Sequence, residues 1–377
     1  MIVDGLARLT ELRHRLVRAM DDRGDWPTDS PWVRDAMEAV PRHLFAPDRV
    51  WEWDGWEYVP VDRRADPGRW AALVHPEPDE PTITQVTDGW ATSSLSCPSI
   101  VADMLDSLML QPDHHVLELG TGTGWNAGLL AAGTGPGRVT SVDIDPGLAS
   151  AARERLDAVG AGVAVHTGDG ALGAPGAAGG APPYDRVVAT YAVDRIPWPW
   201  VEQTRPGGRI VTPWGRLGHV ALTVADDGRS ASGWMQGLAM FMPSRGYDQG
   251  RPWDRVRGAG PPEAEEPLAL DVRALHTDRD LLFALRVLLP DIRITTTTAA
   301  PGTPLTARLH DGHSSWATLA ASGVTHRGGP RHLPDEAARA TTHWQAAGAP
   351  GLYDFGLTRT PDQQYIWSGD KDTGPRW

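Results

Sequence analysis

Apolar side chains recur at helical spacing near the N-terminus and then give way to an irregular stretch. The spacing within residues 4–21 predicts an amphipathic helix. Its apolar face consists of Leu6, Leu9, Leu12, Leu16 and Met20. Asp29 or Ser30 is placed to cap a second helix that has Pro31 at its first position. Residues 48–90 are rich in Trp, Pro and Asp without sustained periodicity, so we expect a long ordered loop there.

Short apolar runs alternate with helical patterns through the middle of the chain. The runs that predict strands are residues 116–119, 138–143, 162–167, 184–190 and 205–213. The helical patterns are residues 98–108, 125–132, 146–159 and 196–204. This alternation predicts an α/β fold in which a parallel-rich sheet has helices on both faces. Residues 220–224 and 234–242 flank an Asp-Asp-Gly turn and predict a terminal hairpin.

The composition changes at about residue 246. Gly, Pro and Asp dominate residues 246–267, which predicts a linker or an exposed crossing. Beyond it we expect a smaller α+β domain, with helices at 281–289 and 334–347, strands at 292–298 and 314–321, and a hairpin at 356–367. The Ala/Gly/Pro-rich residues 170–183 predict a flexible loop. The chain thus divides into an N-terminal region of helices and Trp-rich loop (1–90), a central domain (91–245) and a C-terminal extension (246–377).

Composition and charge narrow the class of protein. The 377 residues carry a formal net charge of −13 at pH 7, which argues against a general binder of nucleic acid or membrane surfaces. The N-terminus lacks the features of a signal peptide, and no run approaches the ~18 apolar residues of a membrane span. A single cysteine, Cys97, excludes an internal disulfide and a Cys-rich metal site. We therefore expect a soluble, cytoplasmic protein.

Some reactive residue types lack the partners that chemistry requires. His114 and His115 have no carboxylate or cysteine partner at metal-ligand spacing, so we predict no metal site. Cys97 has no identifiable partner histidine and is expected to be a small, partly buried side chain rather than a nucleophile. His43 is expected to be structural.

A glycine turn after the first strand of the predicted sheet is the main signal for a ligand. Gly120, Gly122 and Gly124 follow residues 116–119 directly, and a helix is predicted to begin at Trp125. Backbone N–H groups at such a strand–turn–helix junction face a ligand, and no Cβ blocks its approach. A dinucleotide site needs a further glycine where Trp125 stands, so the dinucleotide pattern fails.

The turn and three other segments resemble one family. The spacing Glu-x-Gly-x-Gly-x-Gly from Glu118 to Gly124 resembles motif I of S-adenosylmethionine (SAM)-dependent methyltransferases. Residues 33–47, which end in Val-Pro-Arg-His-Leu-Phe-Ala-Pro, closely resemble the N-terminal segment of protein-L-isoaspartate O-methyltransferases. Residues 94–98 match that family's Thr-Ile-Ser-x-Pro segment, with Ser for Thr and Leu for Ile. The resemblance covers roughly residues 10–245 and implies a Rossmann-like methyltransferase fold, SAM as the methyl donor and S-adenosylhomocysteine as its product.

The resemblance also implies roles for individual residues. Ser96 stands at the place of the family's functional serine, so we expect it to orient the acceptor carboxylate together with Ser94; the alternative is that Ser96 only caps a helix. Glu118 fits the acidic position near the methionine end of the cofactor, or else satisfies amides of the turn. Trp125 either flanks the cofactor or packs in the core. The implied cofactor-binding residues are Ser93, Leu95, Glu118, Gly120, Thr121, Gly122, Gly124, Trp125, Asp143, Ile144, Asp169 and Gly170.

The chemistry expected of this site is simple. A carboxylate at the end of the second strand suits the cofactor ribose, because it can accept hydrogen bonds from two hydroxyls. We assign Asp143 to this role, with Asp145 as the less favoured candidate. An acceptor carboxylate is already ionised at neutral pH, so methyl transfer requires no general base and no catalytic triad. The protein has to hold the acceptor oxygen roughly 3 Å from the methyl group and exclude water.

Three departures from the short repair enzymes of this family bear on the substrate. They are the Trp-rich residues 48–90, the substituted Ser94-Leu-Ser motif and the extension over residues 246–377. They resemble actinobacterial relatives that methylate an aspartate in ribosomally made precursor peptides such as lanthipeptides, which leads to aspartimide and then isoaspartate. We favour this function, with the extension as the peptide-substrate domain. The alternatives are repair of isoaspartyl proteins and, in another class, a non-catalytic SAM-binding protein.

Overall fold

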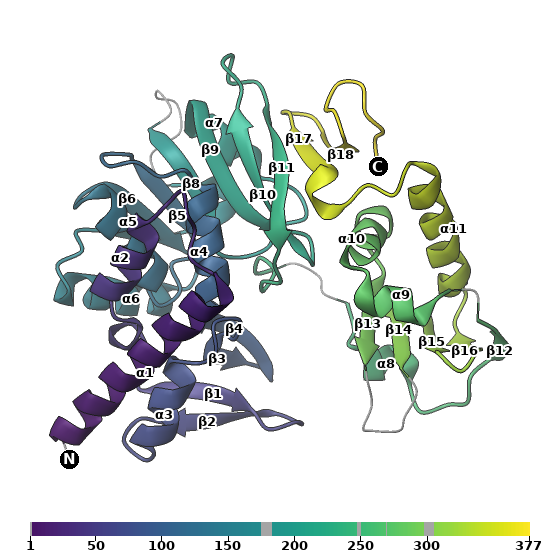
Figure 1. Cartoon of the computed structure of the whole chain (residues 1–377), viewed down its shortest axis with the longest axis horizontal. Helices are drawn as coiled ribbons and strands as arrows, with labels where there is room; N and C mark the ends of the chain where they lie inside the picture. Colours follow the sequence, from purple (N-terminus) through teal and green to yellow (C-terminus); the bar gives the residue numbers. More distant parts are fainter. Residues whose placement is uncertain (1, 175–182, 247–249, 269, 298–304) are drawn as a thin grey trace.

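A nine-stranded sheet forms the centre of the protein in the computed structural model, which describes residues 2–174, 183–246, 250–268, 270–297 and 305–377. The strand order is β18-β17-β11-β10-β9-β8-β5-β6-β7 (Figure 1). Five neighbouring strands are parallel: β5 (Val116–Leu119), β6 (Val139–Asp143), β7 (Ala164–Thr167), β8 (Tyr184–Ala189) and β9 (Thr204–Trp214). Antiparallel strands then extend the sheet: β10 (Gly218–Val224), β11 (Ala231–Leu238), β17 (Phe355–Arg359) and β18 (Gln364–Ser368). The predicted parallel-rich α/β sheet and the hairpin after it are confirmed.

Helices bury both faces of this sheet. All four residues of β5 are buried, which explains why its apolar residues Val116, Leu117 and Leu119 do not alternate with exposed polar ones; the fourth residue, Glu118, is a buried carboxylate. Val116 and Val188 face an apolar cluster shared with the helices α1 (Ile2–Arg23), α2 (Trp32–Ala39), α4 (Pro98–Ser107), α5 (Trp125–Thr134) and α6 (Pro146–Ala158). Leu117 and Val187 face a second cluster that includes α7 (Trp198–Glu202). The buried apolar side chains of β5 and β8 therefore belong to two cores, one on each face of the sheet.

Residues 48–90 contain a second sheet, so the prediction of a loop there is wrong. The strands β1 (Arg49–Trp53), β2 (Tyr58–Asp62), β3 (Thr82–Thr87) and β4 (Trp90–Leu95) form a four-stranded sheet in the order β2-β1-β3-β4. The helix α3 (Pro67–Val74) lies between them in sequence, with Asp66 accepting a hydrogen bond from the Arg69 N–H as its cap. Most side chains of these strands are only partly buried, so apolar and polar residues do not alternate along them. The Asp66-Pro67 pair was a usable signal for the start of α3.

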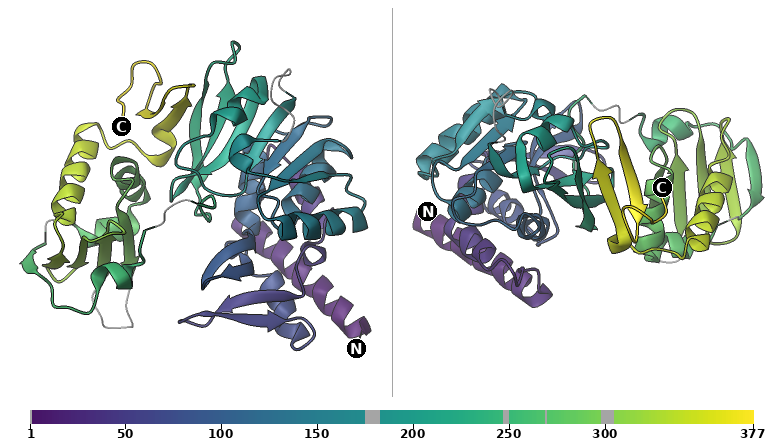
Figure 2. Two further views of the ribbon diagram at one scale, coloured as in Figure 1. Left: turned by 180° about the vertical axis from the view of Figure 1, so that it is seen from behind. Right: turned by 90° about the horizontal axis from the view of Figure 1, so that it is seen from above.

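The C-terminal region forms a third sheet, and it shares a core with the first. The strands β12 (Ala264–Pro267), β13 (Arg293–Thr297), β14 (Thr306–His310), β15 (Trp316–Ala320) and β16 (Val324–Gly328) are antiparallel in the order β12-β16-β15-β14-β13. Its helices are α8 (Trp253–Arg257), α9 (Val272–Thr277), α10 (Arg279–Leu288) and α11 (Leu333–Ala346). The hairpin predicted over residues 356–367 is present as β17–β18, but it adds to the nine-stranded sheet (Figure 2). One apolar cluster runs from Leu117 through Leu357 to Leu309, so the region has no separate core.

Smaller expectations have mixed outcomes. The predicted N-terminal helix is confirmed as α1. The predicted cap by Asp29 or Ser30 is wrong, because Pro31 stands at the N-cap of α2 and no side chain caps it. Of the predicted loop over residues 170–183, residues 175–182 lie outside the described structure. Within the described ranges, no helix is long and apolar enough to cross a membrane.

Phe355 joins the C-terminal hairpin to α10 and provides a test of the shared core. Its fully buried ring lies 5.3 Å from the rings of both Phe283 and Trp377. Phe355→Ala should lower the free energy of unfolding by about 3–5 kcal/mol, because it leaves a cavity where the two regions meet. Urea titration followed by tryptophan fluorescence measures this loss. The control is Tyr353→Ala, whose side chain is 66% exposed and whose loss should cost less than about 0.5 kcal/mol; equal losses in both variants would contradict the shared core.

Candidate active site

Most of the residues predicted to form the site line one cavity of about 1200 Å³ at the carboxyl ends of β5, β6 and β8. The exceptions are Glu118 and Gly124; a Cβ at Gly124 would meet Ala152 and Leu156 of α6 at 3.3 Å. The cavity walls come from the β4–α4 junction, the glycine turn after β5, the segments after β6, β7 and β8, and residues 238–245. Such a crevice at the carboxyl ends of parallel strands is the usual place for a ligand in an open α/β sheet.

Glycine is required in the turn after β5. Gly120 has φ 92°, and a Cβ there would stand 2.4 Å from the Thr190 hydroxyl and 2.9 Å from the Tyr191 ring. Gly122, with φ 54°, has more space, since the closest atom to a Cβ would be the Ser93 hydroxyl at 3.6 Å. Only glycine adopts these conformations without strain. The backbone of the turn is therefore open on the cavity side.

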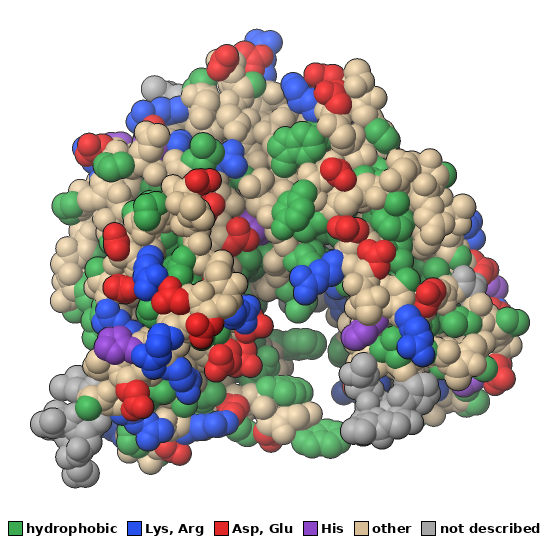
Figure 3. Space-filling model, viewed as in Figure 1, with side chains coloured by type: hydrophobic (Ala, Val, Ile, Leu, Met, Phe, Trp, Pro, Cys, Tyr) green, Lys and Arg blue, Asp and Glu red, His purple; other side chains and the backbone are tan. Residues whose placement is uncertain are grey.

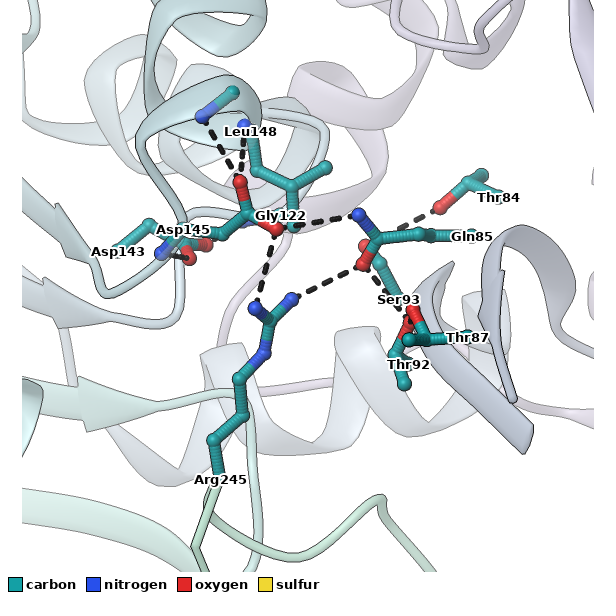
Figure 4. Close-up of polar contacts among 11 residues, drawn as sticks. Thr84, Gln85, Thr87, Thr92, Ser93, Gly122, Asp143, Asp145, Leu148 and Arg245 are labelled. Atoms are coloured by element: carbon teal, nitrogen blue, oxygen red, sulfur yellow. Dashed lines mark hydrogen bonds and ion pairs between the residues drawn. The ribbon is translucent and has the colours of Figure 1, made fainter. Parts of the chain in front are cut away.

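Asp143 is the carboxylate of the cavity wall at the end of β6. It accepts hydrogen bonds from the backbone N–H groups of Gly122 (2.8 Å) and Asp145 (2.9 Å) (Figure 4). Burial raises the pKa of Asp143 above its ordinary value, and these two N–H groups oppose the shift. The neighbouring Ile144 also lines the cavity and is 46% exposed. A fixed carboxylate beside an exposed apolar surface suits a ribose joined to a flat base.

Asp145 has other partners and does not line the cavity in the described residues. It caps α6 by accepting from the N–H groups of Gly147 and Leu148. Its other oxygen accepts from Arg245 at 3.1 Å and from Gln85 at 3.2 Å, while Arg245 also donates to the Gln85 amide oxygen at 3.0 Å. Figure 4 shows this triad joining three separate parts of the chain beside the glycine turn. The geometry thus favours Asp143 over Asp145 as the residue that meets a ligand.

Glu118 lies behind the wall of the cavity. It is fully buried in β5 and accepts hydrogen bonds from Asn126 at 2.8 Å and from the Ser141 hydroxyl. Asn126 does line the cavity, so any effect of Glu118 on a ligand passes through this amide. Sequence reasoning missed Asn126, although its place in the first turn of the helix after the glycines was a usable signal.

The β4–α4 junction brings four predicted residues to the cavity. Ser93 is buried and accepts from the Thr84 hydroxyl at 3.2 Å, and Leu95 is buried beside it. Ser94 and Ser96 line the cavity, and their hydroxyls have no hydrogen-bond partner among the described residues. The alternative role of Ser96 as a helix cap is wrong, because Cys97 is the N-cap of α4 and no side chain caps it. Both hydroxyls are therefore available to a ligand.

Arg42 is a buried residue that sequence reasoning missed. Its guanidinium donates to the carbonyls of Val74 (3.0 Å) and Leu95 (2.9 Å) and lies 4.5 Å from the centre of the Trp125 ring. Burial lowers the pKa of Arg42 to about 9. Nothing in the Pro-Arg-His run after the second helix indicates that its arginine is buried. Arg42 fixes the β4–α4 junction against Trp125.

The remaining predicted cofactor residues occupy the edge of the cavity. Trp125 is buried, donates to the Val40 carbonyl at 3.1 Å and also lines the cavity, so it packs and faces a ligand at once. Thr121 is buried beside the turn. Asp169 accepts from the Ala171 N–H, and Gly170 approaches the Tyr191 hydroxyl where a Cβ would stand only 2.5 Å away.

The residues judged unsuitable for chemistry have ordinary partners. The Cys97 thiol donates to the Asp79 carbonyl, and burial raises its pKa, which disfavours the thiolate. His115 contacts Arg138 at 2.7 Å, and His114 accepts from the Gln111 N–H. Over the described ranges, no three His, Cys, Asp or Glu side chains are placed to hold a metal ion.

The buried state of Glu118 predicts a pH-dependent stability. Burial raises its pKa from 4.5 to about 7, so between these values the folded protein holds a proton that the unfolded chain releases. Stability therefore falls as pH rises through this window, and Glu118→Gln removes that fall. Urea titrations of both proteins at several pH values between about 4 and 8 measure the difference, which should favour the variant increasingly toward the upper end. A difference that stays constant with pH would contradict the raised pKa.

Comparisons with known proteins agree with this geometry. The protein-L-isoaspartate O-methyltransferase of Aeropyrum pernix is 36% identical over 225 residues, which cover 58% of this chain and 74% of that protein. Protein-L-isoaspartate O-methyltransferase 1 of Archaeoglobus fulgidus is 33% identical over 222 residues, or 58% of this chain and 88% of that protein. A solved structure titled protein-L-isoaspartate O-methyltransferase superposes with a TM-score of 0.54 and 19% identity over 95% of this chain and 100% of that one, which supports the fold.

The family model named Protein-L-isoaspartate(D-aspartate) O-methyltransferase matches residues 13–243, which include every predicted site residue. The expected methyltransferase class and its methyl donor, SAM, are thereby confirmed at the level of the family. The chain belongs to the protein-L-isoaspartate(D-aspartate) O-methyltransferase family.

Proposed function

We propose that the protein transfers the methyl group of SAM to the carboxylate of an isoaspartyl residue in a peptide or protein. The supporting observation is that the family match over residues 13–243 includes every residue that lines the cavity except Ser244 and Arg245. This was the alternative function in the sequence analysis, and the relatives favour it over modification of a precursor peptide.

The described residues fit SAM. Asp143 offers a fixed acceptor to ribose hydroxyls, and Ile144 offers an apolar surface to adenine. Gly120 and Gly122 line the cavity with backbone in a conformation that favours glycine, so they present no side chain to the cofactor. The cavity of about 1200 Å³ exceeds the range of roughly 300–1,000 Å³ common for small-molecule sites, which leaves space for an acceptor side chain.

The chain's own residues orient and shield the acceptor. When bound, SAM supplies an electrophilic methyl group. Ser94 and Ser96 donate hydrogen bonds to the acceptor carboxylate and direct one oxygen toward that methyl group. The carboxylate is ionised at neutral pH, so no side chain has to remove a proton. Arg42 holds the junction that carries both serines.

A second candidate substrate is an aspartate in a precursor peptide. Three tryptophans of the four-stranded sheet are exposed: Trp53 (54%), Trp56 (89%) and Trp90 (55%). Figure 3 shows an opening between this part of the molecule and the C-terminal region, with hydrophobic side chains on its edge. None of the three tryptophans lines the cavity, but β4, which begins at Trp90, reaches it through Thr92 and Ser93. Exposed aromatic side chains on a sheet that reaches the cavity suit a peptide longer than the acceptor residue. Residues 246–377 would form the other side of this peptide site. The C-terminal extension does not distinguish the two substrates. The solved structure titled protein-L-isoaspartate O-methyltransferase aligns with 95% of this chain, so the alignment includes most of the extension.

The test compares two peptides by intact mass after incubation with SAM. An isoaspartyl peptide should gain the mass of one CH₂ unit, and its aspartyl counterpart should not. Modification of only a cyclised aspartyl precursor, followed by loss of methanol as the aspartimide closes, would replace the repair function with the second candidate. Binding of SAM without methylation of either peptide would support the third alternative, a SAM-binding protein that is not catalytic. Ser96→Ala should lower kcat by up to about 100-fold while SAM still binds, because the acceptor loses its orienting donor.

Asp143 provides a test of the cofactor site that does not depend on turnover. Asp143→Asn should raise the dissociation constant of S-adenosylhomocysteine by about tenfold or more, because a charge-assisted hydrogen bond to the ribose is lost. Isothermal titration calorimetry measures this change. The matched variant Asp145→Asn should have the smaller effect, because Asp145 lies outside the cavity wall. A larger effect of Asp145→Asn would reverse the assignment.

A further inference from the structure

The loop of residues 190–197 forms one wall of the cavity and is held by the C-terminal hairpin β17–β18. Gln364, the first residue of β18, makes two hydrogen bonds with this loop. Its Oε1 accepts from the Ile196 N–H at 2.8 Å, and its Nε2 donates to the Asp194 carbonyl at 2.8 Å. One side-chain amide therefore fixes the backbone on both sides of Arg195.

The same hairpin also contacts the loop through two arginines. Arg359, which is buried, donates from Nε to the Ile196 carbonyl at 2.7 Å. Arg195 donates from Nη2 to the Asp362 carbonyl in the turn between β17 and β18 at 2.8 Å. The hairpin thus holds both the backbone and the guanidinium of Arg195 at the edge of the cavity, where Arg195 is exposed.

Arg195 differs from the other cationic side chains of the cavity wall. The arginines that line the described wall are Arg23, Arg195 and Arg245. Arg23 lies 3.0 Å from each of two aspartates, and Arg245 lies 3.1 Å from Asp145. Arg195 forms no ion pair with any described carboxylate, and its guanidinium donates only to the Asp362 backbone carbonyl among the described residues. Its charge is therefore available to an anion that enters the cavity.

The cavity wall is acidic, so a cation there changes the binding of an anionic substrate. The described wall carries the aspartates Asp25, Asp79, Asp103, Asp106, Asp143, Asp169 and Asp194. The whole chain has a net charge of −13. A carboxylate substrate is repelled by these charges unless a cation compensates for them. A methyl ester carries no charge, so the same cation does not hold the product.

We propose that Arg195 binds the acceptor carboxylate of the peptide substrate, and that Gln364 is the positioning residue that holds Arg195 in place. This inference rests on the proposed function, in which a peptide carboxylate is methylated. It makes the C-terminal hairpin part of the acceptor site, although the hairpin follows the family-matched residues 13–243 in sequence. Arg195 attracts the carboxylate of the substrate but not the uncharged methyl ester of the product. Product release is therefore not slowed by this interaction.

The experiment uses Arg195→Gln, Gln364→Glu and the double variant in the full chain. The isosteric Gln364→Glu keeps the acceptor for the Ile196 N–H but places a carboxylate oxygen against the Asp194 carbonyl. Arg195→Gln should raise KM for the methylated peptide about tenfold, with kcat and the dissociation constant of S-adenosylhomocysteine nearly unchanged. Gln364→Glu should raise KM severalfold alone and add nothing in the Arg195→Gln background. Arg195→Lys should recover part of the loss because it restores the charge.

Controls separate this inference from stability and from the choice of substrate. Gln363→Ala removes an exposed neighbouring side chain in the same turn and should leave KM unchanged. Both candidate peptides carry an acceptor carboxylate, so the test runs on whichever is methylated. Peptide affinity is also measured with S-adenosylhomocysteine present, which requires no turnover. An unchanged KM and peptide affinity in Arg195→Gln would overturn the role of Arg195. Additive losses in the double variant would overturn the role of Gln364, and a wild-type chain that binds neither peptide would overturn both.

Discussion

The close approach of Gly120 to Thr190 sets the geometry on which the cavity depends. The chain leaves β5 at Gly120, and the Thr190 hydroxyl donates to the Gly120 carbonyl at 2.5 Å. Any Cβ at Gly120 would collide with this hydroxyl. Gly120 begins the turn on the cofactor side, and Thr190 begins the loop of residues 190–197 on the acceptor side. One steric constraint between two parallel strands therefore brings the two halves of the site together.

The C-terminal region is structurally part of the catalytic unit. Its hairpin adds two strands to the nine-stranded sheet, and its helices bury the same apolar cluster as the sheet. Removal of the region would leave Leu117 and Val187 with part of their covering lost. Point variants at the loop–hairpin contact are consequently more informative about function than deletions, because they leave this core intact.

The cavity combines an acidic wall with a small number of fixed cations. Arg42 is buried, does not line the cavity and donates to the carbonyls of Val74 and Leu95 and to the Thr82 hydroxyl, so it organises the serine junction rather than binding a ligand. Arg245 donates hydrogen bonds to Asp145 and Gln85 beside the glycine turn. Arg42 and Arg245 thus have structural partners within the protein. Arg195 has no carboxylate partner among the described residues, and we assign it to the acceptor.

The sequence by itself determined the elements whose signals are local. The run from Val116 to Trp125 specifies a buried strand, a glycine turn and a helix start within ten residues, and Asp143 is the last residue of the next strand. The four-stranded sheet escaped detection because its short strands are stabilised by pairing between distant segments, as between Trp51 and Ile83. Arg42, Asn126 and Arg195 were missed for a related reason: their roles depend on which atoms surround them.

Only the tertiary structure decided where the C-terminal hairpin lies and what it contacts. The hydrogen bond from Arg359 to Ile196 joins residues 163 positions apart, and no spacing within either segment indicates it. Periodicity reports which face of an element is buried, but it does not identify the element that buries it. The sequence therefore determined the cofactor turn, while long-range packing decided the wall that faces the acceptor.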